Sequence, residues 1–425
     1  MIETKYPAQA ESVWTGTLPD GLRIQVVKKT GFRQCHAMFA TRYGGADRRF
    51  SLAGEWIDTP AGVAHFLEHK MFDMPDGRNV LAELSARGAN PNAFTGAGVT
   101  AYHFTCTEDF YTNLETLLTY VSTPWYTPES VAKEQGIIGQ EIRMYENDPS
   151  SVGFYGLAEI LYRSHPVRET VAGTVESISH ITPEVLYDCY RVFYNPSNMA
   201  LCCVGDVDPE QVAAMAEALL PREGGPIPER DHGPEESPLP ERERATHAMA
   251  VSAPLFYLGA KLIPEGDGRA LLRMQLLSEL SMEYLAGRAS SFYTELYAQG
   301  LLGRNFGTGT EYAAGAMMTL MAGESRDPEA VAAAFAERID RIARRGVDAA
   351  AFERCRRARY GAELGGLDQF SGYARSLVNG AFQGWGIDDV FAILAELTPE
   401  DAAGFLCENL NAGRTAMSVV APAAD

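Results

Sequence analysis

Residues 62–72 read Gly62-Val63-Ala64-His65-Phe66-Leu67-Glu68-His69-Lys70-Met71-Phe72 and carry the strongest signal in the chain. His65, Glu68 and His69 stand at positions i, i+3 and i+4, which share one face of a helix. Two neutral imidazoles can hold a zinc ion, and a carboxylate beside them can take a proton from an attacking water. The order is the inverse of the commoner His-Glu-x-x-His arrangement of zinc hydrolases. We therefore predict a hydrolytic metal site here.

The alternative is a surface helix that carries two histidines and a glutamate without binding metal, since short motifs also occur by chance. The rest of the stretch argues against this alternative, because most of it is apolar. Three titratable side chains on an apolar helix are costly unless they share a partner. The apolar residues are Val63, Ala64, Phe66, Leu67, Met71 and Phe72.

Length and composition indicate a globular protein of more than one domain. The chain has 425 residues, and domains average about 150 residues. Hydrophobic residues make up 46% of the chain, which provides ample core. With 36 basic and 56 acidic residues, the net charge is −20. This charge argues against nucleic-acid binding, because phosphate contacts need a basic surface.

The seven cysteines include no C-x-x-C pair, and we interpret them as reduced thiols of a cytoplasmic protein. Residues 1–5 lack the basic and then apolar pattern of an export signal. No apolar run approaches the ~20 residues that span a bilayer. We therefore expect no membrane insertion. The cysteines are Cys35, Cys106, Cys189, Cys202, Cys203, Cys355 and Cys407.

A second helix is predicted from Thr127-Pro128-Glu129 to about residue 145, because a capping threonine, a proline and an acid mark its start. Glu134 and Glu141 lie two turns apart in it and share a face. A zinc ion held by two histidines takes a third protein ligand. Either glutamate could be that ligand, or a solvated surface residue, and the residues alone do not decide. The apolar side of the helix is Ile137, Ile138 and Ile142.

Residues 90–96 followed by the alternating segment 99–106 predict an edge strand that leads into a hairpin. An exposed edge can pair with an extended peptide. The alternative is that Asn92 and Thr95 are only turn residues. His36 and His103 lie in predicted strands, and we interpret them as structural residues.

Residues 223–244 are rich in Pro, Gly, Glu and Arg and read as an interdomain linker between domains 1–222 and 245–425. The second domain repeats the order of elements of the first. No histidine follows His247, so we expect metal in the first domain only. The expected elements are a strand near 246–253, helices around 268–286 and 328–344, a hairpin at 303–322 and a strand at 416–420.

Taken together, these segments resemble the pitrilysin/insulinase family of zinc metallopeptidases, in its short, two-domain bacterial type. The resemblance covers nearly the whole chain. It implies an α+β fold with two similar halves, each a mostly antiparallel sheet with helices packed on one face (the LuxS/MPP-like architecture). The matching segments are 62–72, Asn92-Ala93-Phe94-Thr95, Glu134 to Ile142, and Tyr194 to Met199 running into Val204-Gly205-Asp206.

The resemblance also implies roles for individual residues. Two histidines and a glutamate would hold one Zn²⁺ per chain: His65, His69 and Glu141. Glu68 would be the general base and Glu134 an acid that orients the site. The substrate backbone would lie along Asn92, Ala93 and Phe94.

One segment departs from the family pattern. Active members have an Arg and a Tyr in a stretch like Leu-Arg-x-x-Gly-Leu-x-Tyr, and here Tyr297 and Gly303 stand at those places, with Arg304 one position off. Some relatives divide the work between two chains. We hypothesise a zinc-dependent endopeptidase that cuts peptides or unfolded segments in a closed chamber. It would form a homodimer, or a heterodimer with a related chain that supplies the Arg/Tyr pair. The alternative is a non-catalytic scaffold or peptide-binding member.

Overall fold

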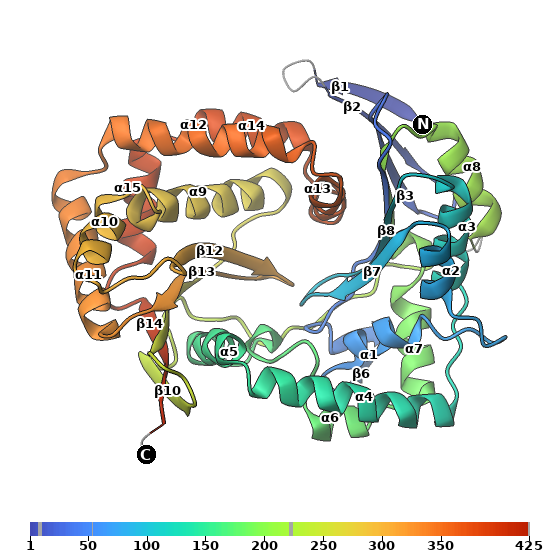
Figure 1. Cartoon of the computed structure of the whole chain (residues 1–425), viewed down its shortest axis with the longest axis horizontal. Coiled ribbons are helices and arrows are strands. Elements are labelled where there is room, and N and C mark those ends of the chain that lie inside the picture. Colours follow the sequence, from blue (N-terminus) through green and yellow to red (C-terminus); the bar gives the residue numbers. More distant parts are fainter. Residues whose placement is uncertain (7–10, 53, 221–223, 424–425) are drawn as a thin grey trace. The chain divides into compact units, whose positions relative to one another are not determined.

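The computed structural model describes residues 1–6, 11–52, 54–220 and 224–423, and the chain forms two compact units (Figure 1). The first unit consists of Met1–Ile142, Thr170–Asp231 and Leu364–Asp388. The second consists of Arg143–Glu169, His232–Glu363 and Asp389–Asp425. In the described part of the chain, no helix is long and apolar enough to cross a membrane.

The first unit is built on a seven-stranded sheet with the order β1-β2-β3-β9-β4-β8-β7, in which only β3 and β9 run parallel. Met38 in the middle of β4 lies between Cys202 of β9 and His103 of β8. The strands are β1 (Ile2–Tyr6), β2 (Glu11–Thr17), β3 (Arg23–Lys28), β4 (Cys35–Thr41), β7 (Asn90–Thr95), β8 (Thr100–Cys106) and β9 (Met199–Gly205), with β5 (Arg49–Leu52) and β6 (Glu55–Asp58) as a separate pair.

Every residue of the central strands β4 and β9 is buried, so both faces of this sheet are covered. Successive side chains of a strand point to opposite faces. Cys203 accordingly lies near Tyr111 of α3, whereas Cys202 lies near Tyr373 of α13. Figure 1 shows α13 on one side of the sheet and α2, α3 and α8 on the other. The helices are α1 (Val63–Lys70), α2 (Val80–Ala86), α3 (Phe110–Val121), α4 (Pro128–Glu146), α6 (Val175–Ser179), α7 (Pro183–Phe193), α8 (Pro209–Leu219) and α13 (Phe370–Gln383).

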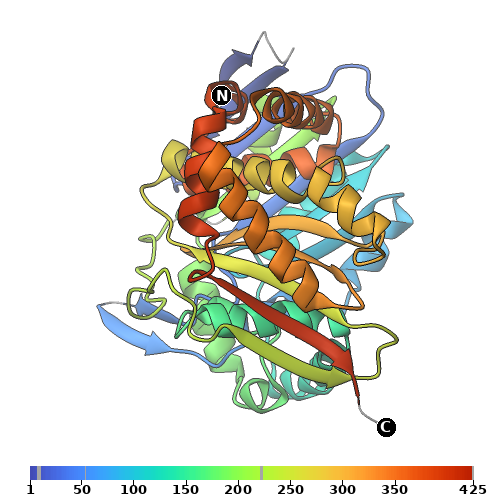
Figure 2. The same ribbon diagram turned by 90° about the vertical axis from the view of Figure 1, so that its left-hand side faces the viewer.

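The second unit has a five-stranded sheet with the order β10-β14-β11-β13-β12, and only β10 and β14 run parallel. These two strands lie side by side in Figure 2, β14 in dark red and β10 in yellow-green. The strands are β10 (Arg244–Met249), β11 (Leu255–Leu262), β12 (Gly307–Ala313), β13 (Ala316–Glu324) and β14 (Thr415–Pro422). The helices are α5 (Pro149–Leu161), α9 (Gly268–Ala286), α10 (Ser291–Ala298), α11 (Pro328–Arg345), α12 (Ala349–Gly366), α14 (Ile387–Glu396) and α15 (Pro399–Asn409).

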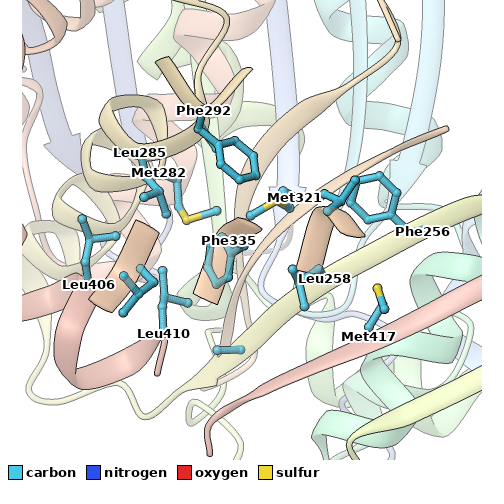
Figure 3. Packing of buried hydrophobic residues seen from close by; sticks show 14 of the residues in the cluster. Phe256, Leu258, Met282, Leu285, Phe292, Met321, Phe335, Leu406, Leu410 and Met417 are labelled. Carbon is cyan, nitrogen blue, oxygen red and sulfur yellow. The ribbon is translucent and has the colours of Figure 1, made fainter. Parts of the chain in front are cut away.

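Alternation along β13 divides the second core into two layers. Met317 and Met321 belong to a cluster with Phe292 of α10 and Phe335 of α11, shown in Figure 3. Met318, one position along from Met317, belongs to a cluster with residues of α5 on the other face. Each sheet therefore has several helices on one face and a single helix on the other.

The predicted α+β architecture of two similar halves with mostly antiparallel sheets is confirmed. The unit boundary between Asp231 and His232 falls inside the segment 223–244, of which residue 223 lies outside the described residues. The division into domains 1–222 and 245–425 stays a prediction. The compact units differ from it, because α5 packs in the second unit and α13 in the first.

Most of the elements expected in the second half are present. The helices at 268–286 and 328–344 are α9 and α11, and the hairpin is β12–β13. The strand expected near 246–253 is present in part, because β10 covers 246–249 whereas residues 250–254 are not strand. There are two strands, β10 and β11, separated by a turn in which the Val251 N–H donates to the carbonyl oxygen of Met249. All seven cysteines are free and five are buried, while the cytoplasmic location inferred from them stays a prediction.

Candidate metal centre

The motif helix α1 is held at its start by a close backbone contact. Gly62, its N-cap, has φ of 98°, and a Cβ there would lie 2.6 Å from the carbonyl oxygen of Ala172. Only glycine fits this combination of left-handed backbone and contact without strain. Phe66 and Leu67 are fully buried on the inner side of the helix. The contact and the burial together fix the direction in which the motif side chains point.

Three potential ligand atoms from two helices converge. The ligand atoms of His65 and His69 on α1 and of Glu141 on α4 all lie within 4.8 Å of one another. Nε2 of each histidine is 3.5 Å from an oxygen of the Glu141 carboxylate. Ligands at ~2.1 Å from a tetrahedral zinc are ~3.4 Å apart, so the donor set and its spacing fit this ion. The sequence left open whether Glu134 or Glu141 is the third ligand, and these distances favour Glu141.

Glu134 lies behind His69 and contacts its other ring nitrogen. Its Oε1 is 3.0 Å from Nδ1 of His69, and its Oε2 is 4.0 Å from Nζ of Lys70. Burial alone would lower the pKa of His69, but the bond to Glu134 and the surrounding carboxylates outweigh burial and raise it. A carboxylate on Nδ1 fixes the tautomer that leaves Nε2 free to bind metal. The buried Nδ1 of His65 has no hydrogen-bond partner among the described residues.

Glu68 shares the helix face but is not part of the three-residue group. Its Oε2 accepts a hydrogen bond of 2.6 Å from the Thr95 hydroxyl at the end of β7. Burial raises the pKa of Glu68, while the Thr95 hydrogen bond and the two histidines oppose the rise. The carboxylate is thus positioned beside the candidate ligands by a residue of the neighbouring strand.

Strand β7 is the edge of its sheet and pairs only with β8 among the described strands. The predicted substrate residues Asn92, Ala93 and Phe94 all lie on it. Thr95 faces α1, so alternation places Ala93 on the same face and Asn92 and Phe94 on the opposite one. The edge strand expected from the sequence is confirmed as an element of the fold.

His36 and His103 lie outside the metal group. Their rings are 5.3 Å apart, and Nδ1 of His36 is 2.9 Å from the Thr105 hydroxyl. Burial lowers the pKa of His36 to about 3, so this histidine is neutral at ordinary pH. Its neutral, hydrogen-bonded state is that of a structural residue.

Two features of the site were not predicted. Lys70, only 1% exposed, lies next to Glu134, and a buried lysine cannot be recognised from sequence. Thr95 was considered only as a turn or family-pattern residue. One detail of α4 was wrong: Ile137 is 48% exposed, whereas Ile138 and Ile142 are buried.

The segment that departs from the family pattern belongs to the second unit. Tyr297 lies at the end of α10 and is 44% exposed. The Tyr293 hydroxyl donates to the carbonyl oxygen of Gly303, and the Arg288 side chain donates to that of Arg304. These bonds hold the backbone of the segment.

Comparison with known proteins finds similarity over almost the whole chain. Residues 53–175 match the family described as insulinase (peptidase family M16), and residues 180–359 match the peptidase M16 inactive domain. YmfH of Bacillus subtilis, described as an uncharacterized zinc protease, is 35% identical over 424 residues, which is 98% of each chain. The crystal structure of an M16-like peptidase from Alicyclobacillus acidocaldarius has a TM-score of 0.93 and 34% identity, over 99% of this chain and 100% of that one. A protease from Helicobacter pylori shares the fold, with a TM-score of 0.82 at 17% identity over 96% of this chain and 99% of that one.

Proposed function

The chain belongs to the pitrilysin/insulinase (M16) peptidase family, and from this membership we propose that it is a zinc-dependent endopeptidase that cuts peptides or unfolded segments. One observation carries the proposal. The ligand atoms of three side chains lie within 4.8 Å of one another, and a second carboxylate, Glu68, lies on the same face of α1 as the two histidines without belonging to that group. A metalloprotease needs this division between ligands and base.

His65, His69 and Glu141 would hold one zinc ion, and Glu134 would keep His69 in the tautomer that binds it. The bound ion would polarise the scissile carbonyl and acidify a water molecule. Glu68 would accept the proton of that water as the new C–O bond forms. It would then pass the proton to the amine as the C–N bond breaks.

The substrate would lie along β7. The outer backbone N–H and C=O groups of an edge strand can pair with an extended peptide. Thr95 connects this strand to Glu68 by a hydrogen bond, so a peptide paired with β7 would lie beside the base. Because pairing uses backbone groups, this mode suits unfolded segments better than folded proteins.

Glu68→Gln tests the proposal. We expect the variant to keep its zinc and to lose cleavage of an unstructured peptide mixture, because glutamine has nearly the same shape but cannot accept the proton. His65→Ala should lose both zinc and cleavage. Mass spectrometry of the peptides and metal analysis of the protein give the two results. Cleavage by Glu68→Gln at the wild-type rate would contradict the role of Glu68.

The second candidate function is capture of peptides without cleavage, or a scaffold role, and it is favoured by the match of residues 180–359 to a domain described as inactive. A binding member would retain the same peptides and leave them intact. A scaffold would retain none and hold no zinc.

A further inference from the structure

The side chain of Arg375 contacts Phe94 of the predicted substrate strand β7, although Arg375 belongs to the second half of the sequence. It is the one charged residue of α13 (Phe370–Gln383), which packs on the first unit's sheet. Its guanidinium carbon is 4.1 Å from the centre of the Phe94 ring. In Figure 1, α13 lies on the side of the sheet opposite α2 and α3. The packing of α13 on the sheet of the first unit thus brings a positive charge to the edge strand β7.

The positive charge of Arg375 is not paired within the part of the chain that the structure describes. Among the described residues, Arg375 forms no ion pair and its side chain is exposed. Its neighbours are the aromatic Phe94 and the imidazole of His103, whose pKa is lowered by burial and then by the positive charge of Arg375. The chain as a whole carries a net charge of −20, so an exposed arginine without an acid is a local site of positive charge on an acidic protein. Stacking on a ring leaves the N–H groups of a guanidinium able to bind a carboxylate.

The two faces of β7 differ in chemistry. Thr95 points to the face that holds Glu68, whereas Phe94 points to the face that holds Arg375. A peptide that pairs with the outer edge of β7 continues this alternation, because side chains of adjacent strands stand side by side on each face. Every second side chain of that peptide would therefore lie on the Arg375 face.

We propose that Arg375 is a specificity residue that binds a carboxylate of the peptide lying along β7. The carboxylate is either an acidic side chain on the Arg375 face or the C-terminal carboxylate of the peptide. This inference rests on the proposed function, and it names the substrate class: peptides that place a carboxylate, from a side chain or from the C-terminus, on the Arg375 face. Arg375 is not a catalytic residue in this account, because it lies on the face away from Glu68.

The simpler role for Arg375 is to hold α13 on β7 through its contact with Phe94. The two roles predict different results. A purely structural contact would make Arg375→Gln less stable and leave peptide preference unchanged. A specificity residue would change the preference, and added salt would weaken that preference because the charges are exposed.

The test measures binding to the full chain in the Glu68→Gln background, so that no peptide is cut. Fluorescein-labelled peptides of one unstructured sequence carry a single glutamate, walked through a glutamine background, with either a free or an amidated C-terminus. Anisotropy gives the dissociation constants for Glu68→Gln alone and with Arg375→Gln, Arg375→Lys or Arg33→Gln. Arg33 is a matched control, since it is exposed in the same unit and its loss changes the net charge equally.

At low salt, we expect the dissociation constant to be about fivefold lower for every second position of the single glutamate along the peptide, or for a free C-terminus. Arg375→Gln should remove this preference, Arg375→Lys should keep part of it, and Arg33→Gln should keep all of it. A preference that is absent, or equal before and after Arg375→Gln, overturns the inference and leaves the proposed function intact. Failure of all variants to bind any of the peptides contradicts the proposed function, and this inference with it.

Discussion

Two carboxylates beside the candidate metal centre, the buried Glu68 and the half-buried Glu134, differ in what they contact. Glu68 accepts from the Thr95 hydroxyl, whereas Glu134 contacts Nδ1 of His69. The first contact suits a base that must keep a lone pair near the substrate. The second suits a residue that acts through the histidine it orients. The two glutamates should therefore fail in different ways when neutralised.

Glu134→Gln should weaken zinc binding by about 10- to 100-fold, because the histidine loses the carboxylate that fixes its tautomer. Competition with a chromogenic chelator measures the affinity. Glu129→Gln is the control, since Glu129 is exposed on the same helix. Equal zinc affinity in both variants would contradict the role of Glu134.

Much of the candidate site could be predicted from sequence because its parts are local. The spacing of His65, Glu68 and His69 on one short helix is a property of a few neighbouring residues, and so is the shared face of Glu134 and Glu141 two turns apart. The sequence left open whether Glu134 or Glu141 is the third ligand. Only the distances from the two histidines to the Glu141 carboxylate favour Glu141. Arg375 could not be predicted, because its place beside Phe94 depends on packing between distant segments.

Among the secondary-structure elements, α5 and α13 explain what sequence reasoning missed, because α5 packs in the second unit and α13 in the first. The apolar face of α5 or α13 indicates that the helix is buried, but not against which sheet. Either helix fits a sheet in its own half equally well by periodicity. The packing of α5 on the second sheet is instead secured by contacts from a third segment. Glu236 makes these contacts from within the predicted linker.

The carboxylate of Glu236 binds the backbone just after the C-terminal end of α5. It accepts hydrogen bonds of 2.9–3.0 Å from the backbone N–H groups of Arg163, Ser164 and His165, and it lies 2.8 Å from Nζ of the buried Lys261 on β11. Burial raises its pKa, but Lys261 and the three N–H groups together lower it to about 2. This arrangement ties α5 to the sheet.

Glu236→Gln should reduce the free energy of unfolding by about 3 kcal/mol at neutral pH, because Lys261 loses its buried partner. The folded pKa of Glu236 lies below its ordinary value of 4.5, so its contribution is complete above pH 4.5 and is lost as the pH falls towards 2. Denaturant unfolding at several pH values should show the wild-type advantage shrinking over this range. Glu235→Gln, an exposed neighbour, is the control. A difference that does not change with pH would contradict the account.

For the whole molecule, the open question is whether one chain suffices for activity. Tyr297 and Gly303 stand where the family pattern has Arg and Tyr, so we propose that a second, related chain supplies that pair. The specific activity of this chain together with the partner that co-purifies with it should then fall on dilution, because the complex dissociates. Sedimentation at the same concentrations checks the state of assembly. Full activity per chain at concentrations where only monomer is present would contradict the need for a partner.

The most direct test of the central claim is removal and return of the metal. The chain, with any partner that co-purifies, is stripped of metal by a chelator and titrated with zinc while cleavage of an unstructured peptide is followed. The account predicts no cleavage by the stripped protein, and activity that rises in proportion to zinc and stops at one ion per chain. Glu68→Gln should take up the same single ion and stay inactive. Cleavage by the stripped wild type, or no binding of zinc at all, would contradict the account.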